Sequence, residues 1–385
     1  MMKGYFDHNA TTPMSGAARQ AWLEAAERHW QNPSSLYREA SEAKRVLEDW
    51  REALADHLGI DEPERIVFTS GATEANNAVI AHLAVGLSGC LVTSEIEHPC
   101  VAAAVSAHLD PSRVRRLPTD PASGAADLGH LQDWIAAGEV GAVSLMAANN
   151  ETGALQPWRE AAELCREHGI PFHTDAAQWF GKRPLDGLGG AGYVTGSGHK
   201  FGGGKGVGFL ILPEDENDRP FHGLIGGPQE HGRRAGTENL PGVAAMVTAL
   251  LEHNEETLAP VWECQARWRD EFERSIEREG GVRLLAKEGR RLWNTSMFVL
   301  PHTKNLKWLT RLSQRGFAVS TGSACSAGKG NPSAVMVAMG LDYEEMGRVL
   351  RASGGLATSG EDWRALAEAI LAVGGELLAE VSVAQ

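Results

Sequence analysis

The chain has 385 residues, of which 43% are hydrophobic and 22% are charged. This composition is typical of a large globular protein and excludes a disordered or collagen-like chain. The 36 basic residues are outnumbered by 50 acidic ones, and the resulting net charge of −14 disfavours direct binding to nucleic acid.

Cysteine spacing and hydropathy exclude several further classes. The five cysteines include no Cys-x-x-Cys pair, which disfavours structural zinc and a disulfide framework, so we expect no metal. No segment reaches the ~18 apolar residues of a membrane-spanning helix. The first residues include Asp7 and lack the apolar stretch of a signal peptide. We therefore expect a cytoplasmic protein that does not contact membranes.

Strand-like and helical patterns alternate over the first 215 residues. An apolar helical stripe ends at Gly59, followed by a strand at 66–69 and a helix at 74–85. Further strands are expected at 90–94, 143–146, 171–174, 193–195 and 207–212, and helices near 98–107, 128–137 and 157–168. This alternation predicts an α/β fold with a mostly parallel sheet covered on both faces.

A charged, proline-bounded loop at 213–220 separates this region from the rest. A long helical stretch over 240–278 follows, with a break expected near Pro260. The remainder mixes strands at 282–285, 295–300, 318–320 and 349–352 with helices, the last over 360–380. We predict a large domain of residues 14–255 and a smaller α+β domain formed by residues 1–13 and 256–385.

Lys200 lies in a glycine-rich segment, 197–208, that fits neither common phosphate-binding pattern. His199 occupies the place where a P-loop ending at Lys205 would need its first glycine, and the segment leads into a strand and not a helix. A lysine in a loop after a strand can instead form a Schiff base with a carbonyl cofactor if its pKa is lowered. The alternative is a solvated loop lysine.

Other residues supply the remaining parts of a pyridoxal phosphate site. Asp175 follows a strand and could keep the pyridine nitrogen of the cofactor protonated. Thr73 and the backbone N–H groups of a tight turn could bind its phosphate, and His98 could stack on its ring. Each of these residues alone could be a helix cap or a satisfied polar group, but together they favour pyridoxal phosphate.

Cys325 lies in a segment, 320–332, made almost entirely of small residues. Such a segment predicts an exposed, mobile loop and a reactive thiol, whereas the other four cysteines occupy apolar or helical contexts and are expected to be inert. The alternative for Cys325 is a small buried hydrophobic residue.

Ten motifs in order along the chain carry a family resemblance. They lie at 7–13, 32–35, 68–76, 97–99, 149–153, 173–178, 197–200, 226–239, 320–326 and 349–351. The sequence resembles the NifS/IscS-like cysteine desulfurases of the class V aminotransferase group. This resemblance implies fold type I of the pyridoxal-phosphate-dependent transferases, with the cofactor in the large domain and the catalytic cysteine loop in the small one. The Thr-Gly-Ser-Ala-Cys325 stretch is similar to the long-loop group of this family.

The resemblance also implies roles for individual residues. Lys200 would bind the cofactor and move protons, His98 would stack on the ring and assist proton transfer, and Cys325 would attack the substrate sulfur. The remaining implied cofactor contacts are Asp175 to the pyridine nitrogen, Gln178 to the phenolic oxygen, and Ala72, Thr73, Ser197, His199 and a second subunit's Thr237 to the phosphate. The implied substrate-binding residues are Asn150 and Arg351.

The activity implied by the resemblance converts L-cysteine to L-alanine and leaves a persulfide on Cys325. A homodimer would then pass this sulfur to an acceptor protein, for example in iron–sulfur cluster assembly. Selenocysteine lyase or another class V reaction such as transamination is an alternative, although transamination needs no thiol like that of Cys325. A further alternative is a catalytically inactive interaction module.

Overall fold

The computed structural model describes residues 2–215, 219–322 and 332–383. None of the helices within these ranges combines the length and the apolar run that crossing a bilayer requires.

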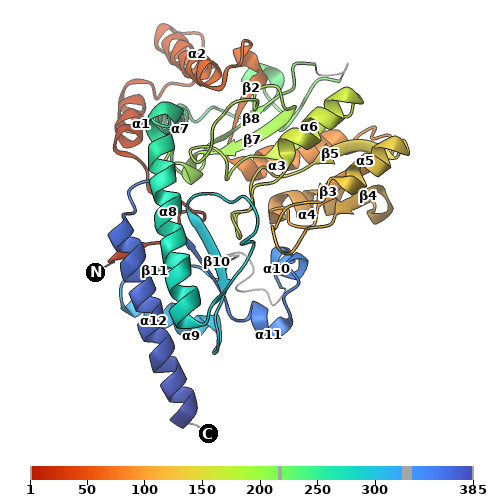
Figure 1. Ribbon diagram of the computed structural model, residues 1–385. Coiled ribbons are helices and arrows are strands. Elements are labelled where there is room, and N and C mark those ends of the chain that lie inside the picture. Colours follow the sequence, from red (N-terminus) through yellow and green to blue (C-terminus); the bar gives the residue numbers. More distant parts are fainter. Residues whose placement is uncertain (1, 216–218, 323–331, 384–385) are drawn as a thin grey trace.

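The largest sheet within the described ranges has seven strands in the order β2-β8-β7-β6-β5-β3-β4 (Figure 1). Its strands are β2 (Ile66–Thr69), β3 (Cys90–Ser94), β4 (Val114–Leu117), β5 (Val140–Ser144), β6 (Phe172–Asp175), β7 (Tyr193–Ser197) and β8 (Gly208–Ile211). Strand β8 runs antiparallel to both of its neighbours, and the other neighbouring pairs are parallel. The predicted mostly parallel sheet is confirmed, and β4 is an edge strand that the sequence patterns did not indicate.

Successive side chains along a strand point to opposite faces of the sheet, and here they join two separate cores. Ile66 and Phe68 join a core with Leu54 of α2, whereas Val67 joins a second core with Val79 of α3. The helices of this part are α1 (Gly16–Arg28), α2 (Arg38–Leu58), α3 (Ala72–Ala84), α4 (Pro99–His108), α5 (Gly129–Ala136), α6 (Trp158–Glu167) and α7 (Leu240–Leu251). Burial of both faces is typical of a parallel sheet covered by helices.

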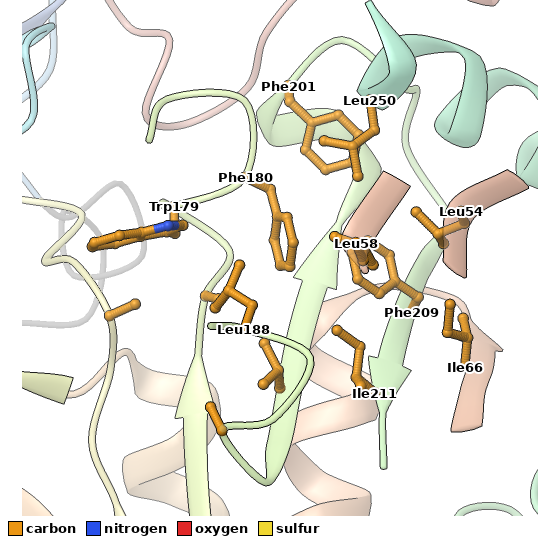
Figure 2. Close-up of a cluster of buried hydrophobic side chains, with 14 of the residues drawn as sticks. Leu54, Leu58, Ile66, Trp179, Phe180, Leu188, Phe201, Phe209, Ile211 and Leu250 are labelled. Carbon is orange, nitrogen blue, oxygen red and sulfur yellow. The ribbon is translucent and has the colours of Figure 1, made fainter. Parts of the chain in front are cut away.

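The first of these cores holds the loops that follow β6 and β7 in place (Figure 2). Trp179 and Phe180, directly after Gln178, are buried, as is Phe201, directly after Lys200. The rings of Phe180 and Phe209 pack edge to face with centroids 4.8 Å apart. These aromatic anchors fix the backbone on which Gln178 and Lys200 are carried.

A second region is built on an antiparallel sheet in the order β12-β10-β9. Its strands and helices are α8 (Glu255–Gly280), β9 (Arg283–Leu284), β10 (Thr295–Val299), α9 (Asn305–Gln314), β11 (Phe317–Ala318), α10 (Ala334–Ala338), α11 (Tyr343–Met346), β12 (Val349–Ser353) and α12 (Gly360–Val383). The long helices α8 and α12 pack along each other (Figure 1). The N-terminal strand β1 (Gly4–Tyr5) pairs with β11, and Phe6 enters the core of this region. The domain boundaries at residues 14 and 255 stay a prediction.

The expected helix break near Pro260 is wrong. The chain breaks instead between α7 and α8, where the Asn254 side chain accepts a hydrogen bond from the Glu256 backbone N–H at 2.9 Å and caps α8. Pro260 lies inside α8, close to its start. Near a helix start a proline costs one backbone hydrogen bond without ending the helix, whereas an asparagine cap begins a new one.

Candidate active site

A cavity of about 570 Å³ opens beyond the carboxyl ends of β2, β3, β5, β6 and β7. Its size suits a small organic ligand. The predicted site residues that line it are Ala72, Thr73, His98, Asn150, Asp175, Gln178, Ser197, His199, Lys200 and Arg351. Thr237 is an exposed residue that is absent from this lining, and Cys325 lies outside the described residues. Residues from distant parts of the sequence, such as Ala72 and Arg351, are thus brought to one cavity.

Lys200 ends a short 3-10 turn (Gly198–Lys200) after β7. Its Nζ atom donates hydrogen bonds to the backbone carbonyls of Asn9 at 2.7 Å and Ala10 at 3.1 Å. Burial, followed by the positive charge of Arg351, lowers the pKa of Lys200 to about 8, while Asp175 acts in the opposite direction. An amine with this pKa supplies an unprotonated, nucleophilic fraction near neutral pH.

The N-terminus of α3 faces the cavity and fits an anion. Gly71, the residue before the helix, has a φ of 149°, which residues with a Cβ rarely adopt. No side chain among the described residues caps this helix, so its first N–H groups remain available as donors. Ser197 and His199 line the cavity beside it. The chemistry of these donors fits a phosphate group.

Asp175, the last residue of β6, is held by a chain of buried polar groups. Its Oδ2 atom accepts a hydrogen bond from Asn76 Nδ2 at 2.8 Å, and its Oδ1 atom accepts one from the Ala177 N–H at 3.0 Å. The Oδ1 atom of Asn76 accepts from Thr195 Oγ1 at 2.6 Å and lies 3.0 Å from His173 Nε2. Burial lowers the pKa of His173 to about 4, so this imidazole is neutral. The network fixes the orientation of the carboxylate towards the cavity.

His98 caps helix α4 and lies against Cys100. Its Nδ1 atom accepts a hydrogen bond from the Cys100 backbone N–H at 3.2 Å and lies 2.9 Å from the Cys100 sulfur. Burial lowers the pKa of His98, with Asp175 opposing and Lys200 adding to this change. Because Nδ1 is an acceptor and the ring is neutral, the proton is on Nε2. Burial raises the pKa of Cys100 to about 12, which keeps this thiol protonated and a poor nucleophile.

Arg351 on β12 brings a buried guanidinium to the cavity. It donates to Asp7 Oδ1 at 2.5 Å and to the Asn150 carbonyl at 2.9 Å. Its Nε atom has no hydrogen-bond partner among the described residues, although it is buried. Arg351 lines the cavity, and a planar guanidinium is well suited to binding a ligand carboxylate.

Comparison with known proteins places this geometry in a family. The sequence profile of the family described as aminotransferase class-V matches residues 4–366. The chain belongs to the class V aminotransferase family.

Relatives within this family support the same assignment. The chain is 35% identical over 367 residues to the IscS-like cysteine desulfurase of Mycobacterium tuberculosis, covering 91% of this chain and 90% of that protein. The solved structure of a NifS-like protein from Rickettsia africae matches with a TM-score of 0.85 at 28% identity, covering 97% and 99% of the two chains. A structure described as SspA in complex with cysteine matches with a TM-score of 0.76 at 31% identity, covering 91% and 98%. The predicted family and α/β fold are confirmed.

The described residues on either side of 323–331, the range that contains Cys325, lie at this class V aminotransferase cavity. Gly322 lines it, and Ser333 donates a hydrogen bond through Oγ to the buried carboxylate of Glu151, which also lines it. Burial raises the pKa of Glu151. Gly322 and Ser333, on the two sides of residues 323–331, are therefore both beside the cavity.

Several residues that the motifs did not assign are part of the site. Asn9 lies within the opening motif and contacts Lys200, whereas Asn76 lies within the motif that contains Thr73. Both are in motifs that the sequence singles out, which is the signal that could have found them. Lys182, which donates to Gln178 and Asn9, lies just beyond the end of the motif at 173–178. Cys100, expected to be inert, lines the cavity.

Proposed function

We propose that this protein is a pyridoxal-phosphate-dependent cysteine desulfurase. The observation that carries the proposal is that four features meet in one cavity: a lysine of lowered pKa, a fixed carboxylate, and, as far as the described residues show, an uncapped helix N-terminus and an incompletely paired arginine. The names of the relatives, and the similar structure of SspA in complex with cysteine, favour cysteine as the substrate.

The chain offers a partner for each part of the cofactor. The N-terminus of α3 with Thr73, Ser197 and His199 would bind the phosphate, and Asp175 would hold a proton on the pyridine nitrogen. Pyridoxal phosphate, when bound, supplies an electron sink for charge that develops on the substrate. The Nζ atom of Lys200 would bind the cofactor and then move the proton at the substrate Cα. His98 would lie on the ring, with its Nε2 proton available for transfer.

The substrate would be held through its carboxylate. Arg351 lines the cavity with a buried Nε donor that has no partner in the described part of the chain, and Asn150 lies directly beside it. Attack by the Cys325 thiolate on the substrate sulfur forms an S–S bond and breaks the C–S bond. The electron pair of the C–S bond stays with the carbon fragment, which takes up protons and leaves as alanine. The sulfur remains on Cys325 as a persulfide for an acceptor protein.

A second copy of the chain would complete the phosphate site through Thr237. The segment 226–239 that carries Thr237 is fixed by two ion pairs, Glu230 to Arg51 at 2.8 Å and Arg234 to Glu74 at 2.8 Å. The apolar residues Leu36 and Ile225 are 99% and 96% exposed and lie on two segments joined by a Gln229–Ser34 hydrogen bond of 3.5 Å. Exposed apolar side chains of this kind favour burial against a second copy. We propose a cytoplasmic homodimer.

The test is direct assay of the purified protein with pyridoxal phosphate, L-cysteine and dithiothreitol. We expect alanine and sulfide in equal amounts, and Cys325→Ser should bind cysteine, with a change in cofactor absorbance, yet release less than about 1% of the sulfide. Protein that binds the cofactor but leaves cysteine intact would refute the proposal. Parallel assays with selenocysteine and alanine separate this activity from selenocysteine lyase and transaminase activity.

A further inference from the structure

Both polar atoms of the Gln178 side-chain amide form hydrogen bonds within the protein. Its Oε1 atom accepts a hydrogen bond from Lys182 Nζ, and its Nε2 atom donates to the Asn9 backbone carbonyl at 2.9 Å. Exchanging the oxygen and nitrogen would set donor against donor and acceptor against acceptor. The orientation of this amide is therefore fixed from two sides.

Lys182 is an unusual group to find at this place. It is 4% exposed, and its hydrogen-bond acceptors among the described residues are two amide oxygens, Gln178 Oε1 and Asn9 Oδ1. Burial, Lys200 and Arg351 lower the pKa of Lys182 well below its ordinary value. A buried lysine without a carboxylate partner is costly, and whether charged or neutral it still donates through N–H groups.

The Asn9 side chain is held just as firmly as that of Gln178. Its Oδ1 atom accepts from Lys182 at 3.3 Å and from Asn294 at 3.1 Å, and its Nδ2 atom donates to Thr295 Oγ1 at 2.8 Å. Its backbone carbonyl accepts from both Gln178 and Lys200. Lys182 thus contacts both Gln178 and Asn9, the residue that binds the other end of the Gln178 amide.

We propose that Lys182 is a positioning residue that holds the Gln178 amide with its nitrogen, and not its oxygen, available to a bound ligand. Gln178 lines the cavity, and an amide nitrogen carries two N–H groups, of which Asn9 uses one. The second would donate to an oxyanion, the phenolic oxygen of the cofactor under the proposed function, on which this inference rests. Without Lys182 only the Asn9 carbonyl would hold the orientation of the amide, and each amide that turned would present its oxygen, which would repel that oxyanion.

The test is a double-mutant cycle on the binding of pyridoxamine 5′-phosphate to the cofactor-free protein, followed by tryptophan fluorescence. This probe has the phenolic oxygen but cannot form an imine with Lys200, so its affinity reports non-covalent binding alone. We expect Q178A and K182M each to weaken binding by about 5- to 10-fold, and the double variant to bind no more weakly than Q178A. The control is K205M, which replaces a lysine that lines the cavity, and its effect should multiply with that of Q178A.

K182M binding within about twofold of wild type, or a double variant whose loss is the product of the two single losses, would overturn the role of Lys182. Wild-type protein that binds neither pyridoxal nor pyridoxamine phosphate would instead overturn the proposed function, and this inference with it. If K182M does not fold, a structure of the wild-type protein with bound cofactor tests the role of Lys182 instead. Lys182 Nζ should remain within about 3.5 Å of Gln178 Oε1, with Gln178 Nε2 facing the phenolic oxygen; any other partner for Oε1 contradicts the inference.

Discussion

Replacing Lys200 with methionine should stabilise the cofactor-free protein while abolishing its activity. The pKa of Lys200 is lowered from 10.5 to about 8, mainly by burial. At about 1.4 kcal/mol per pKa unit, the charged lysine destabilises the folded state by about 3 kcal/mol at pH 7. Methionine removes this cost but also removes donors to the Asn9 and Ala10 carbonyls. We therefore expect a net gain of about 2 kcal/mol in the free energy of unfolding.

The stability difference between K200M and the wild-type protein should depend on pH in the direction that a buried, charged lysine dictates. Below pH 8 the lysine is charged in both the folded and the unfolded state, so the whole cost is present. Between pH 8 and 10.5 the unfolded state binds more protons, and the stability of the wild-type protein rises relative to K200M. The advantage of the variant should shrink by about 2 kcal/mol between pH 7 and about pH 9.5.

Urea unfolding of both proteins without cofactor, followed by tryptophan fluorescence at one protein concentration, measures this difference. Fixed concentration matters because assembly adds to the apparent stability of an oligomer. A K200M protein that is less stable than wild type at pH 7, or an advantage that does not change with pH, would refute the reasoning.

Three further variants test separate parts of the structure. R351K keeps the charge but loses the planar fork, so the KM for cysteine should rise by about 30- to 100-fold with cofactor absorbance unchanged; an unchanged KM would exclude a carboxylate contact. D175N should lower kcat/KM by on the order of 10²–10³ because a neutral amide cannot stabilise a proton on the pyridine nitrogen, and a loss below tenfold in steady-state assays would contradict that role. R51M leaves the carboxylate of Glu230 buried without its partner and should cost about 3–5 kcal/mol of stability in urea unfolding. The matched R45M, which breaks an exposed pair, should cost under about 1 kcal/mol, and equal losses would contradict the dependence on burial.

The residue types of the candidate site could be predicted from the sequence because their chemistry is local. Asp175 ends a strand and Thr73 lies in the first turn of a helix, and parallel strands bring their carboxyl ends to one edge of the sheet. The strand and helix pattern that sets this edge could be predicted as well, since periodicity depends only on near neighbours. Lys200 was recognisable for the same reason, from a glycine-rich loop after a strand.

Partners far apart in sequence could not be predicted in this way. Nothing in local sequence indicates that Asn76 donates to Asp175, 99 positions away, or that Lys200 contacts Asn9, 191 positions away. The helix break near Asn254 was missed because a proline near a helix start and a proline within one have the same local signature.

The amino-acid sequence by itself determined the family, the α/β pattern and the chemical groups that the site contains. Only the tertiary structure decided their state: which lysines have lowered pKa values, which nitrogen of His98 carries the proton and which way the Gln178 amide faces. These properties depend on burial and on hydrogen-bond partners. Packing brings such partners together across the whole chain, so no local pattern of residues specifies them.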